Sequence, residues 1–424
     1  MAHIIQSILQ DANTQWVLLG TMLLGLASGI LGSFALLRKQ SLISDAVAHS
    51  ALPGVCIAFM MIGEKNFAVL LIGAAATGLL SAYLIQMVVQ TTRIKEDTSI
   101  GLVLSVFFGV GIVLLTKVGQ LQTGNKSGLD SFIFGQAASL VGNDVKIMAA
   151  TALVLMMVTA LLFKELKVST FDPQFAKGIG LPTGLLNFIF ISLLVITVVI
   201  GIQAVGVILM AALIITPSIS ARYWTDNLRT MVIISGTFGA ISGMCGTLIS
   251  TLGEGLSTGP FIVLTAAAIF VISLLFAPKR GLLAKLFRRA SIDRLLTERL
   301  ILKTMYSEAG RGIAVTVVSL AETTSVQERK VSRLLKAYES GELIESREDG
   351  WILTNKGRRK AEKVMIIDEL AELSDMYPAE FTAFEKDIRF VDSSEVSEEE
   401  FRRMKNQLSK LKAAYPFIKE GMLL

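Results

Sequence analysis

The fold is decided by residues 16–62, which read WVLLGTMLLGLASGILGSFALL from Trp16 to Leu37, then Arg38-Lys39-Gln40-Ser41, then LISDAVAHSALPGVCIAFMMI from Leu42 to Ile62. Each apolar run is about as long as the roughly 20 residues that a helix needs to cross the hydrocarbon core of a bilayer. The basic pair between the runs is typical of a cytoplasmic loop. This stretch therefore predicts two membrane-spanning helices joined by a short internal turn.

Apolar runs of this kind continue to about residue 280. The chain of 424 residues is 52% hydrophobic and 18% charged, with a mean hydropathy of +0.61, and these values are typical of membrane proteins. We expect nine spans, or eight if a short one does not cross. They are Trp16–Leu37, Leu42–Ile62, Phe67–Val89, Thr98–Leu115, Val145–Phe163, Leu185–Gly201, Val205–Ala221, Met231–Ser250 and Pro260–Phe276.

Charge divides the chain into two parts. Residues 1–280 carry 15 Lys+Arg and 11 Asp+Glu, whereas the rest carries 25 and 24 of the totals of 40 and 35. This change is too abrupt for one folding environment. We predict an all-α polytopic membrane domain over residues 1–280, followed by a soluble α+β domain over residues 281–424.

Lys and Arg also predict the topology, because they are more frequent in cytoplasmic loops. With the N-terminus outside, the internal loops hold Arg38/Lys39, Arg93/Lys95, Lys164/Lys167/Lys177, Arg222/Arg229 and Lys279/Arg280. The external loops hold Lys65, Lys117, Lys126 and Lys146, of which the last three are an exception to the rule. This balance favours a cytoplasmic C-terminal domain.

Two ionisable residues stand inside the second apolar run. Asp45 and His49 are four positions apart, so on an α-helix they share one face. Ionisable side chains are costly at membrane depth and usually mark the path of a substrate or an ion. We predict that the pair binds a divalent metal ion. The alternative is structural: Asp45 would cap a helix that begins near Ser44, and His49 would bond a carbonyl of a neighbouring helix.

Pro53-Gly54 follows this pair by one turn and is predicted to interrupt the helix. Interrupted backbone at membrane depth is tolerated mainly where it is buried in protein or lines a cavity, which favours the transport interpretation. Small residues recur on two other spans and suit close helix packing. They are Gly20, Gly25, Gly29 and Gly32 in the first span and Gly236, Gly239, Gly243 and Gly246 in the eighth.

The predicted internal loop from Lys164 to Pro182 mixes charges with an Asp-Pro helix start at 172–173 and a closing Gly180. This pattern predicts a short capped helix. On the cytoplasmic face, such a helix suits docking of a partner protein. A solvated connector between two spans is an equally weighted alternative.

Several segments together resemble the permeases of bacterial ABC importers for manganese, zinc or iron. These segments are Arg38 to Gly54, Phe171-Asp172-Pro173 with Gly180-Leu181-Pro182, and Val205-Gly206 with Ala211-Ala212-Leu213 and Thr216-Pro217. The resemblance extends over residues 16–277. Given the soluble extension, the chain is most similar to the manganese-importer permeases of Bacillus-type bacteria.

The resemblance implies a multi-pass protein of the bacterial plasma membrane that works with an ABC ATPase subunit and an extracytoplasmic metal-binding solute receptor. Asp45 and His49 would form the relay site for the ion, and the loop around Phe171 would be the coupling helix that docks on the ATPase. The residues expected in this coupling loop are Glu165, Phe171, Asp172, Pro173, Ala176 and Gly180.

The chemistry of the residues agrees with this division of labour. The chain has no G-x-x-x-x-G-K-[ST] motif, the phosphate cradle of many ATPases, so we expect ATP to bind a separate subunit. Asp45 and His49 offer one oxygen and one nitrogen ligand, which manganese, iron and zinc all accept. Two ligands form an incomplete cage, so water or a second permease would complete it, and no cofactor is expected to be bound permanently. The resemblance favours manganese.

The C-terminal part predicts a winged-helix domain. Helices are expected at Ile292–Glu308, Thr316–Ala321 and Val326–Ser340, followed by two short strands at Leu343–Glu345 and Trp351–Thr354. Ser319–Ser340 fits a helix-turn-helix, whose second helix could meet DNA or a partner. The side chains that could do so are Gln327, Arg329, Lys330, Arg333 and Lys336. A solvated helix face is the alternative, because Glu322, Glu328 and Glu339 sit nearby.

Residues 291–365, including Leu353-Thr354-Asn355-Lys356-Gly357-Arg358, resemble iron- and manganese-dependent repressors of the diphtheria-toxin-repressor kind. Where those repressors carry a metal-binding His and Glu after the wing, this chain has Met365 to Glu369, and residues 281–424 contain no histidine. Metal sensing by the same scheme is therefore not expected. A last capped helix is predicted within Ser394–Leu424.

Two further hypotheses remain from the sequence. The chain could be a membrane-tethered transcriptional regulator whose spans serve as an anchor or a sensor. Alternatively, cleavage near 278–289 could release a soluble regulator. The near-zero net charge of residues 281–424 disfavours strong binding to DNA.

Overall fold

The computed structural model describes residues 12–63, 67–120, 142–252, 256–310, 313–376 and 396–414. The chain divides into two compact units, Met1–Ala284 and Lys285–Leu424. Of the predicted features, external-loop Lys65 and Lys126 and residues 394–395 and 415–424 of the predicted C-terminal segment lie outside the described residues.

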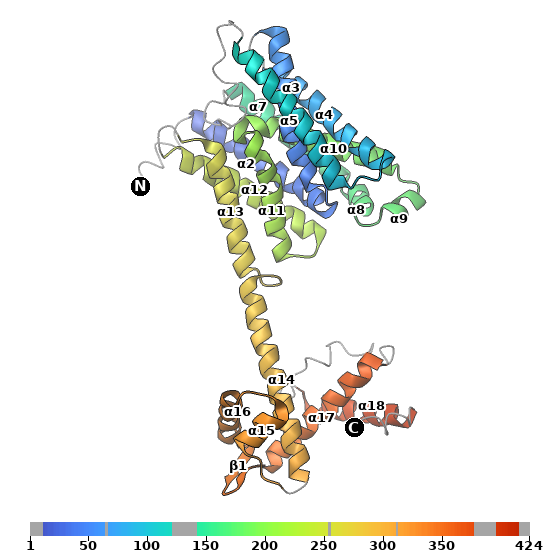
Figure 1. Ribbon diagram of the computed structural model, residues 1–424, viewed down its shortest axis with the longest axis vertical. Coiled ribbons are helices and arrows are strands. Elements are labelled where there is room, and N and C mark those ends of the chain that lie inside the picture. The colour runs from blue at the N-terminus through green and yellow to red at the C-terminus, as the bar shows by residue number, and fades with distance from the viewer. Residues whose placement is uncertain are drawn as a thin grey trace. The chain divides into compact units, whose positions relative to one another are not determined.

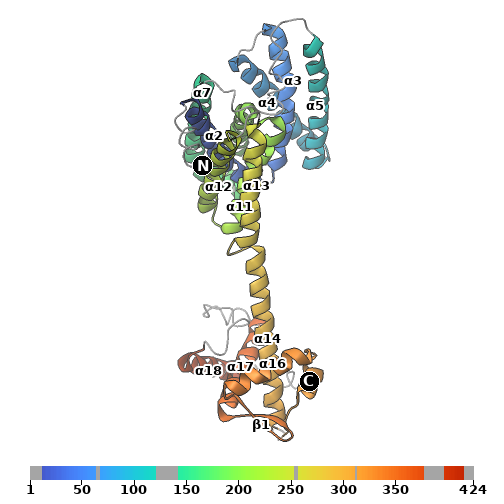
Figure 2. The ribbon, with the colours of Figure 1, turned by 90° about the vertical axis from the view of Figure 1, so that its left-hand side faces the viewer.

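The first unit is a bundle of helices. Eight of those in the described part are long and apolar enough to cross a membrane, namely α2, α3, α4, α5, α7, α10, α12 and α13. The helices of this unit are α2 (Ala12–Leu37), α3 (Ser41–Ile62), α4 (Phe67–Thr91), α5 (Glu96–Gln120), α7 (Gly142–Leu161), α8 (Phe163–Phe171), α9 (Pro173–Gly178), α10 (Thr183–Val205), α11 (Val207–Trp224), α12 (Leu228–Ser250) and α13 (Thr258–Phe276). Helix α3 runs beside α4 and α5 (Figures 1 and 2). The chain is thus a mostly helical, polytopic membrane protein.

The expected span at Val205–Ala221 is the shorter helix α11, which packs against α2, α3, α12 and α13. A single residue, Gly206, separates it from α10. The φ angle of Gly206 is 94° and its ψ angle is 160°, a conformation that glycine adopts far more easily than other residues. The interruption predicted at Pro53-Gly54 was wrong, because α3 continues as a helix from Ser41 to Ile62 with Pro53 inside it.

Close packing of backbones explains the glycines of α2 and α12. A side chain at Gly25 would overlap the carbonyl group of Gly239, and one at Gly243 would overlap that of Thr21. Polar groups join the same two helices, since the Ser235 hydroxyl donates to the carbonyl oxygen of Gly29 at 2.7 Å. The predicted role of these small residues in helix packing is confirmed for Gly25, Gly239 and Gly243.

The second unit combines helices with a small sheet. Its elements are α14 (Leu282–Gly310, which begins in the first unit), α15 (Val317–Thr324), α16 (Glu328–Ser340), β1 (Ile344–Arg347), β2 (Gly350–Leu353), α17 (Asn355–Met376) and α18 (Glu398–Ala414). Strands β1 and β2 are antiparallel, with Ile344 opposite Leu353. Val315 adds an isolated bridge to Trp351, through hydrogen bonds of 3.0 and 2.9 Å.

One apolar core joins α14, α15, α16, the strands and the first part of α17. It includes Ile301, Leu302, Leu320, Val331, Leu335, Ile344, Leu353 and Val364. A smaller cluster joins α17 to α18, around Ile367, Leu370 and Leu408. The predicted cap of the last helix is confirmed, because Ser397 and Glu400 exchange hydrogen bonds between side chain and backbone at its start.

Candidate metal-ion site and coupling segment

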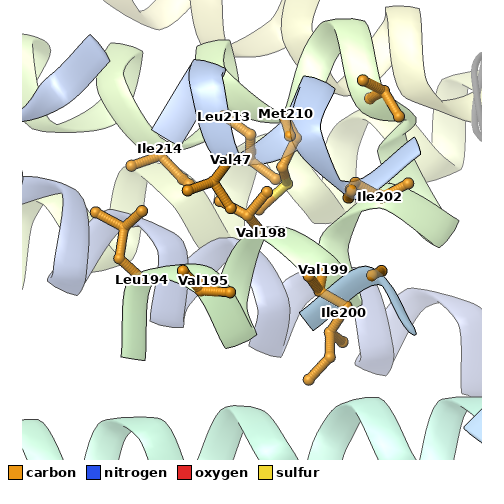
Figure 3. Close-up of a cluster of buried hydrophobic side chains, with 14 of the residues drawn as sticks. Val47, Leu194, Val195, Val198, Val199, Ile200, Ile202, Met210, Leu213 and Ile214 are labelled. Atoms are coloured by element: carbon orange, nitrogen blue, oxygen red, sulfur yellow. The ribbon is translucent and has the colours of Figure 1, made fainter. Parts of the chain in front are cut away.

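Helix α3 begins one turn earlier than Asp45. Its first residue is Ser41, and the residue before it, Gln40, makes no side-chain capping bond. Asp45 therefore lies inside the helix, so the structural alternative in which it caps the helix start was wrong. Packing against α4, α5, α10 and α11 buries most of α3. Figure 3 shows Val47 of α3 in one apolar cluster with Val198 of α10 and Leu213 of α11.

Asp45 and His49 lie together on the face of α3 that this packing leaves partly open. The His49 Nε2 atom is 3.6 Å from Oδ1 of Asp45, and the side chains are 19% and 37% exposed. The rings of His49 and Phe108 of α5 pack at nearly right angles, with 5.0 Å between ring centroids. The other ring nitrogen, Nδ1, is buried and has no hydrogen-bond partner in the described part of the chain, so it does not bond a neighbouring carbonyl there.

The pair lies in the half of α3 that is nearer to the Arg38-Lys39 turn. At a rise of 1.5 Å per residue, Asp45 is about 6 Å and His49 about 12 Å along the helix from Ser41. Within the described residues, no group of three or more His, Cys, Asp and Glu side chains could hold a metal ion. The arrangement therefore offers one carboxylate and one imidazole to a cation, with the remaining coordination positions free for water or another chain.

The segment from Phe163 to Gly180 forms two short helices at one edge of the bundle (Figure 1). The predicted capped helix is α9. The Asp172 carboxylate accepts the backbone N–H of Phe175 at 2.8 Å, and Pro173 occupies the first helical turn. The chain leaves α9 through Gly180, whose φ angle is 83°.

The two sides of this segment differ in their surroundings. Ala176 is fully buried, whereas Phe171, Phe175 and Ile179 are 59%, 57% and 54% exposed. These three large apolar side chains, at the end of α8, in α9 and at its C-cap, are called the α9 surface below. Glu165 behaves differently, because its Oε2 atom is buried and has no hydrogen-bond partner among the described residues.

Arg38 is a residue whose contacts the sequence did not predict. Its guanidinium donates hydrogen bonds to the Thr170 and Ser169 hydroxyls of α8 and to the Asn187 side-chain oxygen of α10, at 3.0, 2.8 and 3.3 Å. It also lies 4.4 Å from the ring centroid of Phe190. In the sequence, Arg38 is only a basic residue in an internal loop, and no local pattern points to partners more than 130 positions away.

In the second unit, the five side chains predicted to meet DNA or a partner are all exposed, namely Gln327, Arg329, Lys330, Arg333 and Lys336. Arg329, Arg333 and Lys336 recur at helical spacing and so share one face. The Lys330 Nζ atom forms an ion pair of 2.7 Å with Asp293 of α14, and Lys330 and Arg333 both line a pocket beside Asp293. Gln327 precedes the helix as its N-cap and makes no side-chain capping bond.

Asp368 of α17 is one of the acidic residues of the segment 365–369. Its carboxylate is 3.0 Å from Lys303 Nζ and 3.9 Å from the buried Arg299 guanidinium. Two cations already surround this acid, so its environment disfavours a further positive ion.

Comparison with known proteins gives consistent matches. The profile of the ABC 3 transport family matches residues 10–277. The manganese transport system membrane protein MntC of Bacillus subtilis is 46% identical over 398 residues, which cover 93% of this chain and 92% of that protein. The zinc transport system membrane protein TroC of Treponema pallidum is 44% identical over 296 residues, which cover 70% of this chain and 99% of TroC.

A solved structure also matches. PsaBC from Streptococcus pneumoniae, in complex with Fab, is 32% identical with a TM-score of 0.59, over 66% of this chain and 98% of that chain. The match to MntC must extend into the second unit, because the first unit has only 284 residues. The match to TroC is close to the length of the first unit alone.

Proposed function

The chain belongs to the ABC 3 transport family, and we propose that it is the membrane permease subunit of an ATP-driven importer that brings a divalent metal ion, with manganese favoured, into the cell. ATP hydrolysis in such a system belongs to a separate ATPase subunit, so the chain is a transporter subunit and not an enzyme. The relatives named for manganese and zinc transport support the class of ion, and the 46% identity with MntC favours manganese.

The observation that carries this proposal is the Asp45–His49 pair. An apolar helix holds a carboxylate and an imidazole 3.6 Å apart on a partly open face. Burying such groups is costly, and a passing cation would offset the cost by binding both. We assign the pair as the relay site of the transported ion.

Two ligands do not fill the coordination sphere of a metal ion, so further donors must come from outside the chain. A second permease, either another copy of this chain or a sister subunit, would bring its own donors to a shared path, and water would fill the remaining positions. The exposed fraction of Asp45 leaves room for such an approach. On the outer side, an extracytoplasmic metal-binding receptor would deliver the ion.

The α9 surface is assigned to the ATPase. Phe171 at the end of α8, Phe175 in α9 and Ile179 at the C-cap of α9 are exposed, and Asp172 and Pro173 fix the start of α9 between them. Exposed apolar side chains of this size are typical of protein contacts. In the topology that the basic loops favour, this segment, the Arg38 turn and the C-terminal unit are all cytoplasmic.

We assign the second unit to the winged-helix class, because helix, bridging residue Val315, two helices, two antiparallel strands and helix follow one another in that order. Its proposed role is regulation. By contacting the coupling segment or the ATPase in metal-replete cells, it would favour one state of the importer over another.

A second candidate function is that of a membrane-tethered regulator, and the exposed Arg329, Arg333 and Lys336 on one face of α16 favour it. Transport is preferred, because relatives named as transport proteins match up to 93% of the chain. If residues 281–424 bind duplex DNA with an affinity that falls steeply as salt rises, the regulator gains support. We expect no such binding.

Uptake of radiolabelled manganese tests the proposal directly. Cells carrying the complete system would express the intact chain, Asp45→Asn, His49→Gln or the control Met60→Leu, a volume-conserving change on the same helix. We expect both site variants to lose most uptake at unchanged membrane abundance, and the control to keep it. Zinc and iron as competitors would identify the preferred ion. Normal uptake by both site variants would remove the pair from the ion path.

A further inference from the structure

Arg38 joins three parts of the bundle that are far apart in the sequence. It stands in the turn between α2 and α3, and its hydrogen bonds reach Ser169 and Thr170 at the end of α8 and Asn187 in α10. The same turn leads directly into α3, which carries Asp45. On the other side of the contact, Thr170 of α8 is followed directly by Phe171 and the capped start of α9. One side chain therefore connects the proposed coupling segment with the helix of the proposed ion site.

The acceptors around this guanidinium are all neutral. Within the described residues, no carboxylate oxygen lies within 4.0 Å of Arg38, and burial lowers the pKa of its guanidinium to about 10. Partial compensation comes from the C-terminal end of α8, where unpaired carbonyls carry partial negative charge. The Ser169 and Thr170 hydroxyls both donate to the Leu166 carbonyl there, so they present their oxygens to Arg38.

A carboxylate with an unsatisfied oxygen lies one helical turn before Ser169. Glu165 is four positions before Ser169 and so stands on the same face of α8. Its Oε2 atom is buried without a hydrogen-bond partner in the described part of the chain. A half-buried carboxylate with one unsatisfied oxygen and a half-buried guanidinium with no anion beside it among the described residues are each unfavourable, and pairing them would relieve both.

A shift of α8 by one helical turn, about 5.4 Å, would bring Glu165 to the position that Ser169 holds now. We propose that Arg38 is a positioning residue that transmits movement of α8 and α9 to the start of α3, and that in a second state of the permease it exchanges Ser169 and Thr170 for an ion pair with Glu165. This inference rests on the proposed function. It goes beyond that function by naming the contact through which ATPase-driven movement reaches the ion site.

The test uses the complete importer, with permease, ATPase and receptor, in lipid vesicles. Manganese uptake and ATP hydrolysis are measured together for Arg38→Gln, Arg38→Lys, Glu165→Gln and the exchanged pair Arg38→Glu/Glu165→Arg. Lys167→Gln, an exposed position on the same helix, is the control. We expect Glu165→Gln and Arg38→Gln to lower uptake per ATP hydrolysed about tenfold, within the usual range of coupling between sites, with subunit composition unchanged.

Arg38→Lys keeps the positive charge but loses the planar guanidinium, which donates several hydrogen bonds at once. Its uptake per ATP hydrolysed should therefore fall between the values of wild type and Arg38→Gln. The exchanged pair should recover part of the loss, which a purely structural role would not produce. A wild-type ratio in Glu165→Gln, or an exchanged pair no better than the single variants, overturns the proposal. If Arg38→Gln fails to assemble, Glu165→Gln decides alone. Failure of the proposed function would look different, because the unaltered importer would then move no manganese.

Discussion

Asp172 fixes the start of α9 with a single hydrogen bond to Phe175 N–H. Replacing it by Ala should weaken the helix start by about 1 kcal/mol, whereas Asn, which caps as well as Asp, should preserve it. We expect Asp172→Ala to bind the ATPase less tightly than wild type, and Asp172→Asn to match wild type. Co-purification of the ATPase with each variant measures this. Equal losses in both variants would assign the effect to the charge of Asp172 instead of the cap.

The spacing of Asp45 and His49 was enough to predict that they share a face, because i and i+4 positions are adjacent on any α-helix. Their surroundings were not predictable. The ring of Phe108 that meets His49 comes from another helix, and nothing in the local sequence selects it. The same holds for Arg38. Its charge predicted only the side of the membrane, and the sequence did not predict its hydrogen bonds to Ser169 and Asn187.

Helices α2 and α12 touch through glycines, and this crossing leaves no room for a side chain. A methyl group at Gly25 would overlap the Gly239 carbonyl, so Gly25→Ala should destabilise the fold by about 1–3 kcal/mol. A methyl group at Gly101 of α5 meets nothing within 4 Å, so Gly101→Ala should not destabilise the fold. Thermal melting in detergent compares the two. An unchanged melting temperature for Gly25→Ala would mean that the helices can separate at little cost.

The α9 surface allows a test at the level of one element. We expect Phe175→Ala combined with Ile179→Ala to reduce ATPase binding by at least tenfold, because truncating central aromatic and aliphatic anchors typically costs more than 1 kcal/mol each. Phe188→Ala on α10 is the matched control, since Phe188 is similarly exposed at 62%. Subunit affinity in detergent measures the difference. A loss as large in the control would indicate a general effect on the bundle.

Breaks between helices were the hardest elements to predict. Pro53 lacks a backbone N–H, yet α3 continues through it, because membrane helices tolerate proline where neighbouring helices support the backbone. The real break is the single residue Gly206, whose left-handed backbone separates α10 from α11. Hydrophobicity alone does not distinguish such a glycine from Gly201 five positions earlier, so the preceding span was predicted to end at Gly201 and the next to begin at Val205.

The two units differ so strongly in charge that composition alone separated them at about residue 280. The order of the helices followed from the length of the apolar runs in the first unit and from the pattern of charged, periodic helices in the second. What the sequence could not supply was the packing partner of each helix, because the apolar faces of α2, α10 and α12 are equally compatible with lipid and with protein.

The match to TroC predicts how the whole molecule responds to truncation. It covers 99% of TroC with only 296 residues, so permeases of this family exist at close to the size of the first unit. We expect a chain ending at Ala284 to retain manganese uptake, with Asp45→Asn in the same truncated chain as the inactive control. Uptake measured across manganese concentrations would also test the regulatory role. An unchanged dose response would exclude it, and lost uptake at normal abundance would make the second unit part of the transport machinery.

The relay site proposed at Asp45 and His49 has only two donors of its own, and this small number has a consequence for timing. At a fixed rate of entry, each 1.4 kcal/mol of added binding free energy lengthens the stay of a bound ion about tenfold. A third or fourth ligand from the same chain would therefore lengthen the stay of a bound ion further. A site with two donors of its own can be completed when a partner approaches and dismantled when it withdraws, so in the proposed importer the motion of the assembly would set the dwell time of the ion.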